Sequence, residues 1–370
     1  MGARTAIPTS KKNKMTIQKK TKPIRVILLG FGLSGKLIHF PLILANPYFK
    51  LIGVLKRNIE DFEYDRTDYK GLTIYDSIDR VILDSYKFDL AIIATPNITH
   101  MSYAKLLMNE GIDVVIEKPI AGNERETQEI FDLADLLNRH IFAFQNRRWD
   151  SDFLTLKKII QMETVGQIIS VESNWENFKE AKNTWRNSAN IDDLGGILLD
   201  LGPHLIDQMI QLLGPIDKLL AEIKIIRPNA NTDDEIRIEM LHRSGVESII
   251  AASHCKKRAS PRFRVKGSKG ELYINDYDTQ EIELRSALTS YSKTKKGSKS
   301  RSVAIFRDID GSEIKQMPGE FGNWQQFYMH VASTLLHKEN FPIKPNEIII
   351  NSRTMDFAKI SSKNKSYITI

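Results

Sequence analysis

The hydrophobic positions in the first part of the chain alternate between short apolar runs and stretches with apolar residues at helical spacing. This alternation predicts a parallel sheet with crossover helices, which is a doubly wound α/β fold with its ligand crevice at the carboxyl ends of the strands. The apolar runs predict strands at 24–29, 49–55, 72–75, 88–94, 112–117 and 141–145. The segments between them predict helices near 34–45, 76–85, 99–109 and 124–138.

The pattern changes after a predicted helix at 151–162, because strand-like runs then follow one another with few helices between them. Hairpin connections of this kind predict mostly antiparallel pairing. These strands are expected at 167–175, 219–226, 235–242, 246–253, 262–266, 271–275 and 281–285. A final helix is predicted at 346–360, followed by a short strand from Ser366 to Ile370.

The length of 370 residues exceeds what one hydrophobic core usually supports, so two domains are expected. The two patterns place a Rossmann domain at 23–146 and a second α/β domain at 147–370. Residues 1–22 precede both and predict a basic, disordered leader.

The net charge of +7 is concentrated near the N-terminus, where residues 1–25 hold eight basic residues and no acidic one. The rest of the chain is therefore close to neutral. A second basic run at 293–301 indicates a solvated surface loop. No recognition helix or aromatic-interleaved basic stripe accompanies these runs, so a nucleic-acid partner is not expected.

Other compositional features narrow the class of protein further. No apolar run is long enough to span a membrane and no secretory signal is evident, so we expect a cytoplasmic protein without a membrane partner. The single Cys255 excludes an internal disulfide framework and a cysteine metal cluster. The eight histidines show no paired metal-ligand spacing, so no metal site is expected.

The first predicted strand runs directly into a G-x-G-x-x-G sequence that opens a helix, which is the pattern of a dinucleotide pyrophosphate site. Gly30 permits the tight turn, Gly32 lets the backbone approach the pyrophosphate, and Gly35 lets the helix lie close to the strand. The alternative is a glycine-rich turn that binds nothing. The residues predicted to contact the cofactor here are Gly30, Phe31, Gly32, Leu33, Ser34 and Gly35.

The end of the second predicted strand indicates which dinucleotide is bound. An NAD site usually carries an acidic residue here, about twenty residues after the glycines, to accept the ribose hydroxyls. This chain has Lys56 and Arg57 instead, and both can pair with a 2′-phosphate. NADP is therefore favoured over NAD, unless these two cations only solvate a strand end.

Two further strand ends carry polar residues that suit the same crevice. The run ending at 94 continues into a turn whose predicted cofactor contacts are Thr95, Pro96, Asn97 and His100. The run ending at 116 continues as Glu117-Lys118-Pro119, where the proline cannot extend a regular ladder. Glu117 and Lys118 are therefore expected at the sheet edge where the nicotinamide of the cofactor would lie.

These motifs, joined to a later Asp200-x-x-x-His204, resemble the glucose-fructose oxidoreductase, inositol dehydrogenase and MocA family from about residue 23 to the C-terminus. The resemblance implies a C-terminal domain with a large, mostly antiparallel sheet through which the chain forms a dimer or tetramer. The motifs at 146–153, 185–186 and 260–263 look like the NADP-dependent scyllo-inositol dehydrogenase branch. The stretch at 174–179 departs from that branch, so the substrate stays open between scyllo-inositol and another polyol or sugar.

Asp200 and His204 stand four residues apart at a predicted helix entry, with Pro203 expected in the first turn. This spacing can place both side chains on one face, where Asp200 would orient His204 and favour its imidazolium form. His204 is the predicted proton acceptor in the oxidation of an alcohol. The resemblance implies that Lys118 hydrogen-bonds the substrate oxygen.

Substrate contacts are less constrained by spacing. Arg186 matches a family position near the nicotinamide and the substrate, so it is predicted to contact the cofactor. Asn146, Arg148 and Trp149 leave the sixth predicted strand and either face the substrate or pack between the domains.

The leading hypothesis is an NADP-dependent dehydrogenase or reductase of a cyclic polyol or sugar, with scyllo-inositol as the first candidate. A different class, a nucleotide-binding sensor or co-regulator that has lost chemistry, would be expected to lack Lys118 or His204. Both residues are present.

Overall fold

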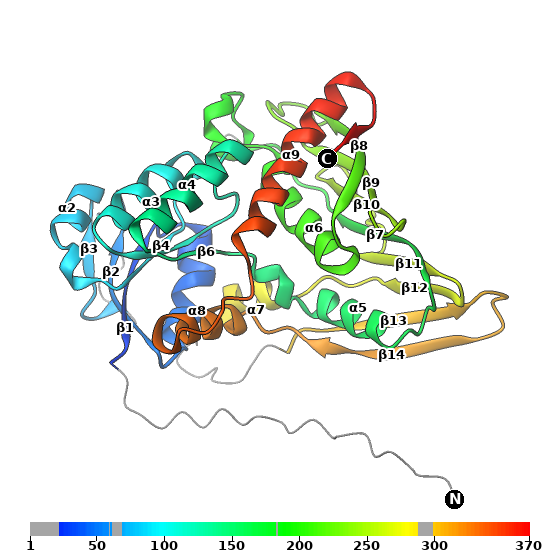
Figure 1. The fold of residues 1–370 in the computed structure, drawn as a ribbon, viewed down its shortest axis with the longest axis horizontal. Helices are drawn as coiled ribbons and strands as arrows, with labels where there is room; N and C mark the ends of the chain where they lie inside the picture. The colour runs from blue at the N-terminus through cyan, green and yellow to red at the C-terminus, as the bar shows by residue number, and fades with distance from the viewer. Residues whose placement is uncertain (1–21, 59, 61–68, 183, 288–298) are drawn as a thin grey trace, which may run out of the picture.

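The computed structural model describes residues 22–58, 60, 69–182, 184–287 and 299–370. The predicted leader lies outside these residues except for Lys22, and most of the basic run at 293–301 lies outside them as well. Figure 1 shows two sheets, each with its own layer of helices, and the long helix α9 (Pro345–Asn364) running between them.

The first sheet is fully parallel, with strand order β3-β2-β1-β4-β5-β6. Helices α2 to α4 cover one face, while η1, α1 and α8 cover the other (Figure 1). The strands are β1 Ile24–Leu29, β2 Phe49–Leu55, β3 Thr73–Tyr75, β4 Leu90–Ile93, β5 Asp113–Ile116 and β6 Ile141–Ala143. The helices are η1 Gly35–His39, α1 Phe40–Leu44, α2 Ile78–Leu83, α3 His100–Asn109, α4 Glu124–Leu137 and α8 Gln325–His337.

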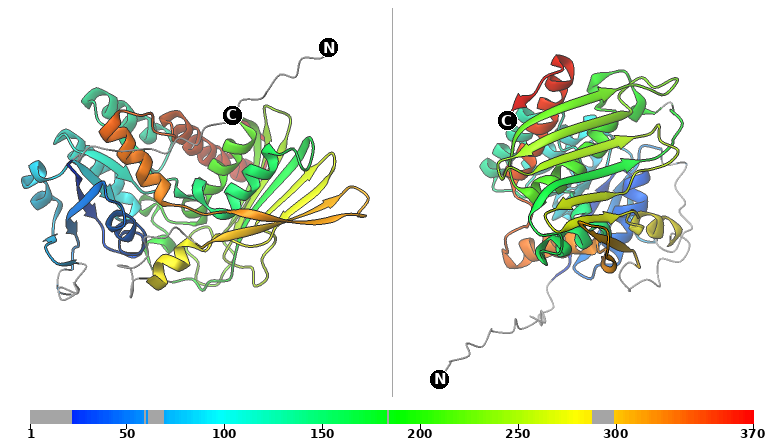
Figure 2. Two further views of the ribbon diagram at one scale, coloured as in Figure 1. Left: turned by 90° about the horizontal axis from the view of Figure 1, so that it is seen from below. Right: turned by 90° about the vertical axis from the view of Figure 1, so that its right-hand side faces the viewer.

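The second sheet has nine strands in the order β14-β13-β12-β11-β7-β10-β9-β8-β15, and only β7 and β10 pair in parallel. Helices α5 (Ser151–Gln161), α6 (Ile197–Leu213) and α9 pack on one face. Figure 2 shows the other face uncovered. The strands are β7 Ile168–Glu176, β8 Ile216–Lys224, β9 Glu235–His242, β10 Glu247–Ser253, β11 Phe263–Gly267, β12 Gly270–Ile274, β13 Arg301–Asp308, β14 Ile314–Phe321 and β15 Ile368–Thr369.

The two sheets differ in burial as their sequences predict. In β1 the four residues from Val26 to Leu29 are fully buried, because helices cover both faces of a parallel sheet. In β9, by contrast, buried residues alternate with more exposed ones, because only one face is covered. The expected doubly wound sheet and the expected mostly antiparallel sheet are both confirmed.

One predicted strand of the second sheet is wrong. Residues 281–285 form part of helix α7 (Gln280–Ala287), where Arg285 pairs with Glu281 at 2.6 Å across one turn. The alternation of apolar and charged residues there is too short to separate strand from helix. The sequence prediction also missed β13 and β14. Pro318 argues against a strand in the sequence, but β14 is an edge strand, and an edge strand can contain a proline.

The start of α6 is also earlier than predicted. The helix begins at Ile197, so Pro203 lies inside it and not in its first turn. The backbone N–H of Ile197 donates to the carbonyl of Asp233 at 2.9 Å, and that of Leu198 donates to the Asp233 carboxylate at 2.7 Å. The cap therefore comes from a residue distant in sequence, which local pattern cannot reveal.

Segments after residue 320 join the two halves. Trp324, Phe327 and Tyr328 pack into the core of the parallel sheet. Within α9, Arg353 pairs with Glu124 of α4 at 2.6 Å. The C-terminal part of the chain thus returns to the first sheet before it completes the second.

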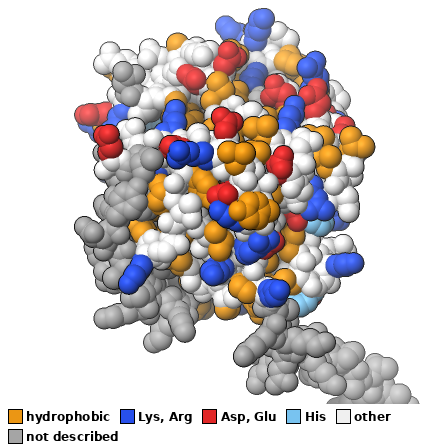
Figure 3. Space-filling view, turned by 90° about the vertical axis from the view of Figure 1, so that its left-hand side faces the viewer, with side chains coloured by type: hydrophobic (Ala, Val, Ile, Leu, Met, Phe, Trp, Pro, Cys, Tyr) orange, Lys and Arg blue, Asp and Glu red, His pale blue; other side chains and the backbone are white. Residues whose placement is uncertain are grey.

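The face of the parallel-sheet half shown in Figure 3 mixes basic, acidic and apolar side chains where described residues form it. Among the described residues, no helix is long and apolar enough to cross a membrane.

Arg262 is a fully buried cation in the second core. Its Nε donates to Asp152 at 3.2 Å, its Nη1 to Ser173 at 2.6 Å and its Nη2 to Gln208 at 2.6 Å. These bonds connect α5, β7 and α6 beneath the sheet. Arg264, two residues later, is partly exposed and pairs with Glu271 at 3.1 Å.

We predict that Arg262→Met lowers the free energy of unfolding by about 3–5 kcal/mol, because it leaves Asp152 buried without its cation. The control Arg264→Met should cost less than about 1 kcal/mol, since the side chains of its ion pair are 32% and 34% exposed. Urea unfolding of both variants measures the difference. Similar small losses for the two would contradict this role of Arg262.

Candidate active site

The glycine-rich turn after β1 is built as its sequence predicts. Gly30 has φ +92°, and a Cβ there would overlap the backbone carbonyl of Ala94. A Cβ at Gly35 would overlap the carbonyl oxygen of Gly30, so this glycine lets the helix lie close to the turn. A Cβ at Gly32 would meet no atom of the described chain within 4 Å. The space beside Gly32 is open to a ligand.

A helix begins immediately after this turn and includes the π-helical segment η1 before α1. Unpaired backbone N–H groups at such a helix start are suited to phosphate oxygens. The hydroxyl of Ser34 donates to Glu117, which follows β5. His39, at the end of η1, lies 3.2 Å from the same carboxylate oxygen. Glu117 therefore ties the start of the helix to the edge of the sheet.

The turn opens into a large cavity of about 1430 Å³ between the two sheets. Most of the residues predicted for cofactor and catalysis line it. They are Gly30, Phe31, Gly32, Leu33, Ser34, Lys56, Arg57, Thr95, Pro96, Asn97, Glu117, Lys118, Arg186, Asp200 and His204. Asn146, predicted for substrate, lines it as well. A dinucleotide thus has a groove that begins at the glycines and ends at Lys118.

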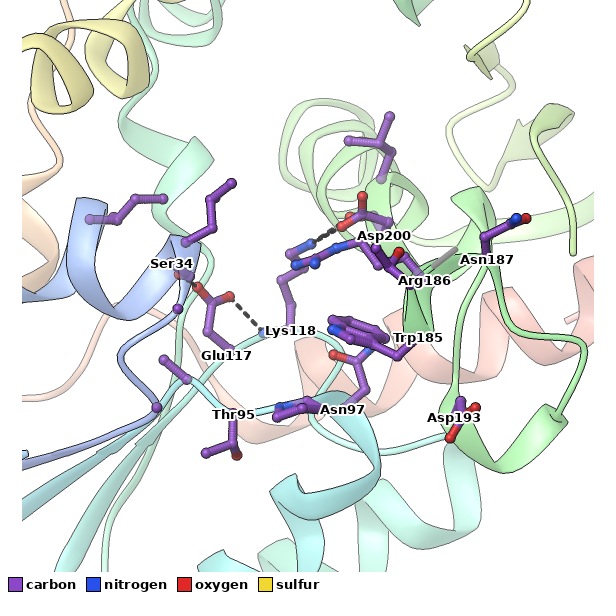
Figure 4. A pocket seen from close by; sticks show the side chains of 18 of the residues that line it. Ser34, Thr95, Asn97, Glu117, Lys118, Trp185, Arg186, Asn187, Asp193 and Asp200 are labelled. Carbon is purple, nitrogen blue, oxygen red and sulfur yellow. Dashed lines mark hydrogen bonds and ion pairs between the residues drawn. The ribbon is translucent and has the colours of Figure 1, made fainter. Parts of the chain in front are cut away.

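Lys118 and Asp200 join the two sheets across this cavity (Figure 4). The ammonium Nζ lies 2.8 Å from Asp200 Oδ1 and also donates to the Asp200 backbone carbonyl at 2.6 Å. Burial by itself would raise the pKa of Asp200, but the charge and hydrogen bond of Lys118 and the charge of Arg186 lower it below its usual range. Asp200 is therefore a carboxylate that holds Lys118 at the end of the groove.

Glu117 is charged for a related reason. Burial would raise its pKa, but the hydrogen bond and charge of His39, the charge of Lys118 and the hydrogen bond of Ser34 lower it to about 2. The carboxylate is thus charged at any pH near neutrality.

His204 is buried, with 5% of its surface exposed, and lines the same cavity. Its Nδ1 lies 3.1 Å from Oε1 of Gln145. Burial lowers the pKa of His204 well below its usual range, and the charges of Lys118, Arg147 and Arg262 lower it further. The imidazole is therefore neutral near pH 7 and able to accept a proton.

The predicted pairing of Asp200 with His204 is wrong. Asp200 bonds Lys118, and His204 bonds Gln145. The lowered pKa of His204 also contradicts the expectation that Asp200 favours the imidazolium form. The spacing of four residues placed both side chains at the cavity, but their partners come from the ends of other strands.

Two of the predicted cofactor residues act behind the cavity wall. His100 is buried, with Nδ1 2.8 Å from the carbonyl of Pro119 and Nε2 3.0 Å from that of Thr95. It therefore connects the loops after β4 and β5. Gly35 also lies behind the wall, where it makes the close approach described above.

Arg148 and Trp149 do not line the cavity, so the structure contradicts their prediction as substrate contacts. Arg148 donates to both oxygens of buried Asp207, at 2.6 and 2.8 Å. Trp149 packs against His330 of α8. The short helix Asn146–Trp149 turns successive side chains in different directions, and both residues occupy the alternative role of packing between the sheets.

Several cavity residues were not predicted from the sequence. Arg147 lines the cavity and stacks on Trp175 at 4.2 Å, and His254 lies on the same wall. Gln145 was missed as the partner of His204. Gln145 and His254 belong to no motif named from the sequence, whereas Arg147 stands within the 146–153 motif without a cavity role having been predicted for it. The available signals were the position of Gln145 next to Asn146 and that of Arg147 within the 146–153 motif.

No three His, Cys, Asp or Glu side chains gather as a metal site within the described residues.

Comparison with known proteins agrees with this architecture. Residues 24–144 match a family model described as an oxidoreductase family with an NAD-binding Rossmann fold, and residues 153–273 match the GFO/IDH/MocA C-terminal domain. The uncharacterized oxidoreductase YdgJ of Escherichia coli (strain K12) is 32% identical over 71% of this chain and 74% of its own length. The chain belongs to the GFO/IDH/MocA family of oxidoreductases. The resemblance stated from the sequence motifs is thereby confirmed.

Other members of the GFO/IDH/MocA family match over nearly the whole chain. The scyllo-inositol 2-dehydrogenase (NADP(+)) IolW of Bacillus subtilis (strain 168) is 26% identical over 95% of this chain and 98% of its own. A crystal structure from Klebsiella pneumoniae, described only as an oxidoreductase, is 28% identical with a TM-score of 0.82. The alignment covers 95% of this chain and 96% of that one.

We predict that Gly32→Ala and Gly35→Ala separate binding from folding. Gly32→Ala should weaken NADPH binding at least about tenfold, or 1.4 kcal/mol, because its Cβ enters the space beside the turn. Its unfolding free energy should change by less than about 1 kcal/mol. Gly35→Ala should instead lower the unfolding free energy by about 1–3 kcal/mol, because its Cβ overlaps backbone.

Calorimetric titration with NADPH and thermal unfolding measure the two effects. Unchanged NADPH affinity in Gly32→Ala would show that the dinucleotide does not pass over this turn.

Proposed function

We propose that this protein is an NADP-dependent dehydrogenase that oxidises a secondary alcohol of a cyclic polyol or sugar, or reduces the corresponding ketone. The observation that carries the proposal is the placement of Lys118, Asp200 and neutral His204 together at the end of the groove that starts at the glycine turn. Scyllo-inositol is the first candidate substrate.

The residues of the groove fit a nicotinamide dinucleotide. The open space beside Gly32 and the helix start suit the pyrophosphate, while Thr95, Asn97 and Glu117 line the route toward Lys118. When bound, the nicotinamide supplies the hydride acceptor or donor. The chain itself has to bind the substrate oxygen and move its proton.

His204 accepts the hydroxyl proton in the oxidising direction, because its imidazole is neutral and lines the cavity. Lys118 donates a hydrogen bond to the substrate oxygen and stabilises negative charge on it. Asp200 holds the ammonium in place through its 2.8 Å ion pair. In the reducing direction Lys118 polarises the carbonyl and His204 returns the proton.

Lys56 and Arg57 support the preference for NADP. Both line the cavity just after β2, and Arg57 is exposed. A 2′-phosphate at this strand end would meet these two cations. The name of IolW, which specifies NADP(+), is consistent with this preference.

The substrate class rests on the same relative and on the polar character of the wall. Trp175, Lys179 and Arg186, which belong to the second half of the chain, line the cavity. Arg186 stacks on Trp185 at 4.2 Å and lies beside Asp200 in Figure 4. Dispersed hydrogen-bonding groups around an aromatic surface suit a polyol ring.

The oligomeric state is part of the proposal. The uncovered face of the nine-stranded sheet carries partly exposed apolar residues of β8, β10 and β13 among charged side chains such as Arg237 and Glu239 of β9. Apolar side chains that are partly exposed on an uncovered sheet face can be buried against a second copy of the chain. We expect a homo-oligomer formed through this face.

A sensor without catalytic activity is the alternative from another class. The presence of Lys118 and His204 in one cavity argues against it, because binding a dinucleotide needs neither residue.

We predict that the protein with NADP and scyllo-inositol produces reduced nicotinamide, measured by its absorbance. Lys118→Met and His204→Asn should each lower kcat at least about a hundredfold, because each removes a group that acts on the substrate oxygen or its proton. NADPH affinity should stay close to that of the wild type. Lys105→Met, on the exposed side of α3, is the matched control.

NADPH binding without turnover of scyllo-inositol or any other polyol would favour the sensor. Full turnover in Lys118→Met or His204→Asn would reject the assigned roles.

We predict that Lys56→Ser/Arg57→Ser weakens NADPH binding at least about tenfold and changes NADH binding little, because NADH carries no 2′-phosphate. Fluorescence titration with each cofactor measures both constants. Lys50→Ser, at the exposed start of the same strand, should affect neither. Equal losses for NADPH and NADH would reject a 2′-phosphate site.

A further inference from the structure

Gln145 lies just after β6, is 4% exposed and contacts His204. Its Oε1 lies 3.1 Å from His204 Nδ1, and its Nε2 lies 3.5 Å from the backbone carbonyl of Pro203. That carbonyl also accepts a 2.8 Å hydrogen bond from Nδ2 of Asn351. The amide of Gln145 thus stands between an imidazole nitrogen and a carbonyl oxygen.

This arrangement determines which end of the amide faces the imidazole. The carbonyl of Pro203 can only accept, so it selects the NH₂ group of Gln145. The reversed amide would set two oxygens against each other. With its NH₂ group directed to Pro203, Gln145 offers its oxygen to His204, and an oxygen can only accept. The proton of the neutral imidazole then belongs on Nδ1.

We propose that Gln145 is a positioning residue that keeps the proton of His204 on Nδ1, so that the lone pair of Nε2 faces the substrate cavity as the base. Nε2 has no hydrogen-bond partner among the described residues, and His204 lines the cavity. The inference rests on the proposed dehydrogenase function and names the residue that prepares its base.

The proton balance of the step is complete with this tautomer. In oxidation the substrate O–H proton moves to Nε2, and the hydride leaves the carbinol carbon with its electron pair for the nicotinamide that the proposed function supplies. A carbonyl forms, and the imidazole becomes an imidazolium with a proton on each nitrogen. Gln145 Oε1 accepts the Nδ1–H bond before and after the transfer, so the amide need not turn.

An amide also differs from a carboxylate in its effect on the base. A carboxylate beside Nδ1 would favour the imidazolium and raise the pKa of His204. The charged groups that act on the ring are Lys118 after β5, Arg147 in the turn after β6 and Arg262 before β11. All three are cations, and Asp200 on the same helix is paired with Lys118. Gln145 therefore orients the ring without opposing their effect.

The tautomer is measured directly by nitrogen NMR of the imidazole in deuterated, ¹⁵N-histidine-labelled protein. The His204 signals are identified by their loss in His204→Asn. We expect the Nδ1–H form in the wild type at neutral pH. In Gln145→Met, which removes the acceptor at similar size, the Nε2–H form should gain at least tenfold over Nδ1–H relative to the wild type. An Nε2–H tautomer in the wild type would overturn the proposal.

The variant Gln145→Glu tests the same role through the titration of His204. Its carboxylate should keep the imidazolium to a pH at least about one unit higher than in the wild type, and move the acidic limb of kcat by the same amount. Asn351→Leu removes the hydrogen bond from Asn351 to the Pro203 carbonyl without changing a contact of the imidazole ring. Both the tautomer and the titration of His204 should therefore match the wild type. A His204 titration unchanged in Gln145→Glu, or shifted equally in Asn351→Leu, would contradict the role of Gln145.

The NMR and activity measurements distinguish a failure of the proposed dehydrogenase function from a failure of the positioning role of Gln145. If no polyol is oxidised, the proposed function fails, yet the NMR signals still report the tautomer. If polyols are oxidised while wild-type His204 carries its proton on Nε2, the function stands and the positioning role of Gln145 fails.

Discussion

The ion pair between Lys118 and Asp200 joins the parallel sheet to the first turn of α6, at the point where the chemistry is expected. Its 2.8 Å separation holds the loop after β5 against the turn of α6 that precedes His204. Both partners are largely shielded from water, so removing either would leave an unpaired charge in a cavity wall. The relative position of the two sheets is therefore part of the site. Asn97 adds a second tie by donating to the carbonyl of Leu194 at 2.9 Å.

The charge of Lys118 favours the ionised form of two neighbouring carboxyl groups and the neutral form of a neighbouring imidazole. Burial by itself raises the pKa of both Glu117 and Asp200, but the charge of Lys118 lowers it and helps to keep each of them ionised. Burial and that same charge remove the proton from His204. The result is a cavity in which anions hold a cation and a neutral imidazole stands beside it. A dehydrogenase needs such a division of roles, because one group must stabilise charge on oxygen while another accepts a proton.

The parallel sheet could be predicted almost strand by strand because its strands are buried on both faces and read as continuous apolar runs. The second sheet was harder to predict, because apolar and polar residues alternate along its strands and the strands at its edges depart from that alternation. Pro318 occurs in the edge strand β14, and the alternation around Ile282 belongs to a helix. The catalytic residues were found by motif, whereas the contacts of Gln145 with His204 and of Arg147 with Trp175 were not predicted, since no spacing connects either pair.

The sequence by itself determined the glycine turn, the cations after β2 and the presence of Lys118, Asp200 and His204, because each depends on residue type next to a strand or helix end. Only the tertiary structure decided which of these groups bond to one another. Asp200 turned out to hold Lys118, and Gln145 to hold His204, because hydrogen bonds and ion pairs are short-ranged and are formed between chain segments that the fold brings within about 3 Å. Local spacing carries no information on such distances.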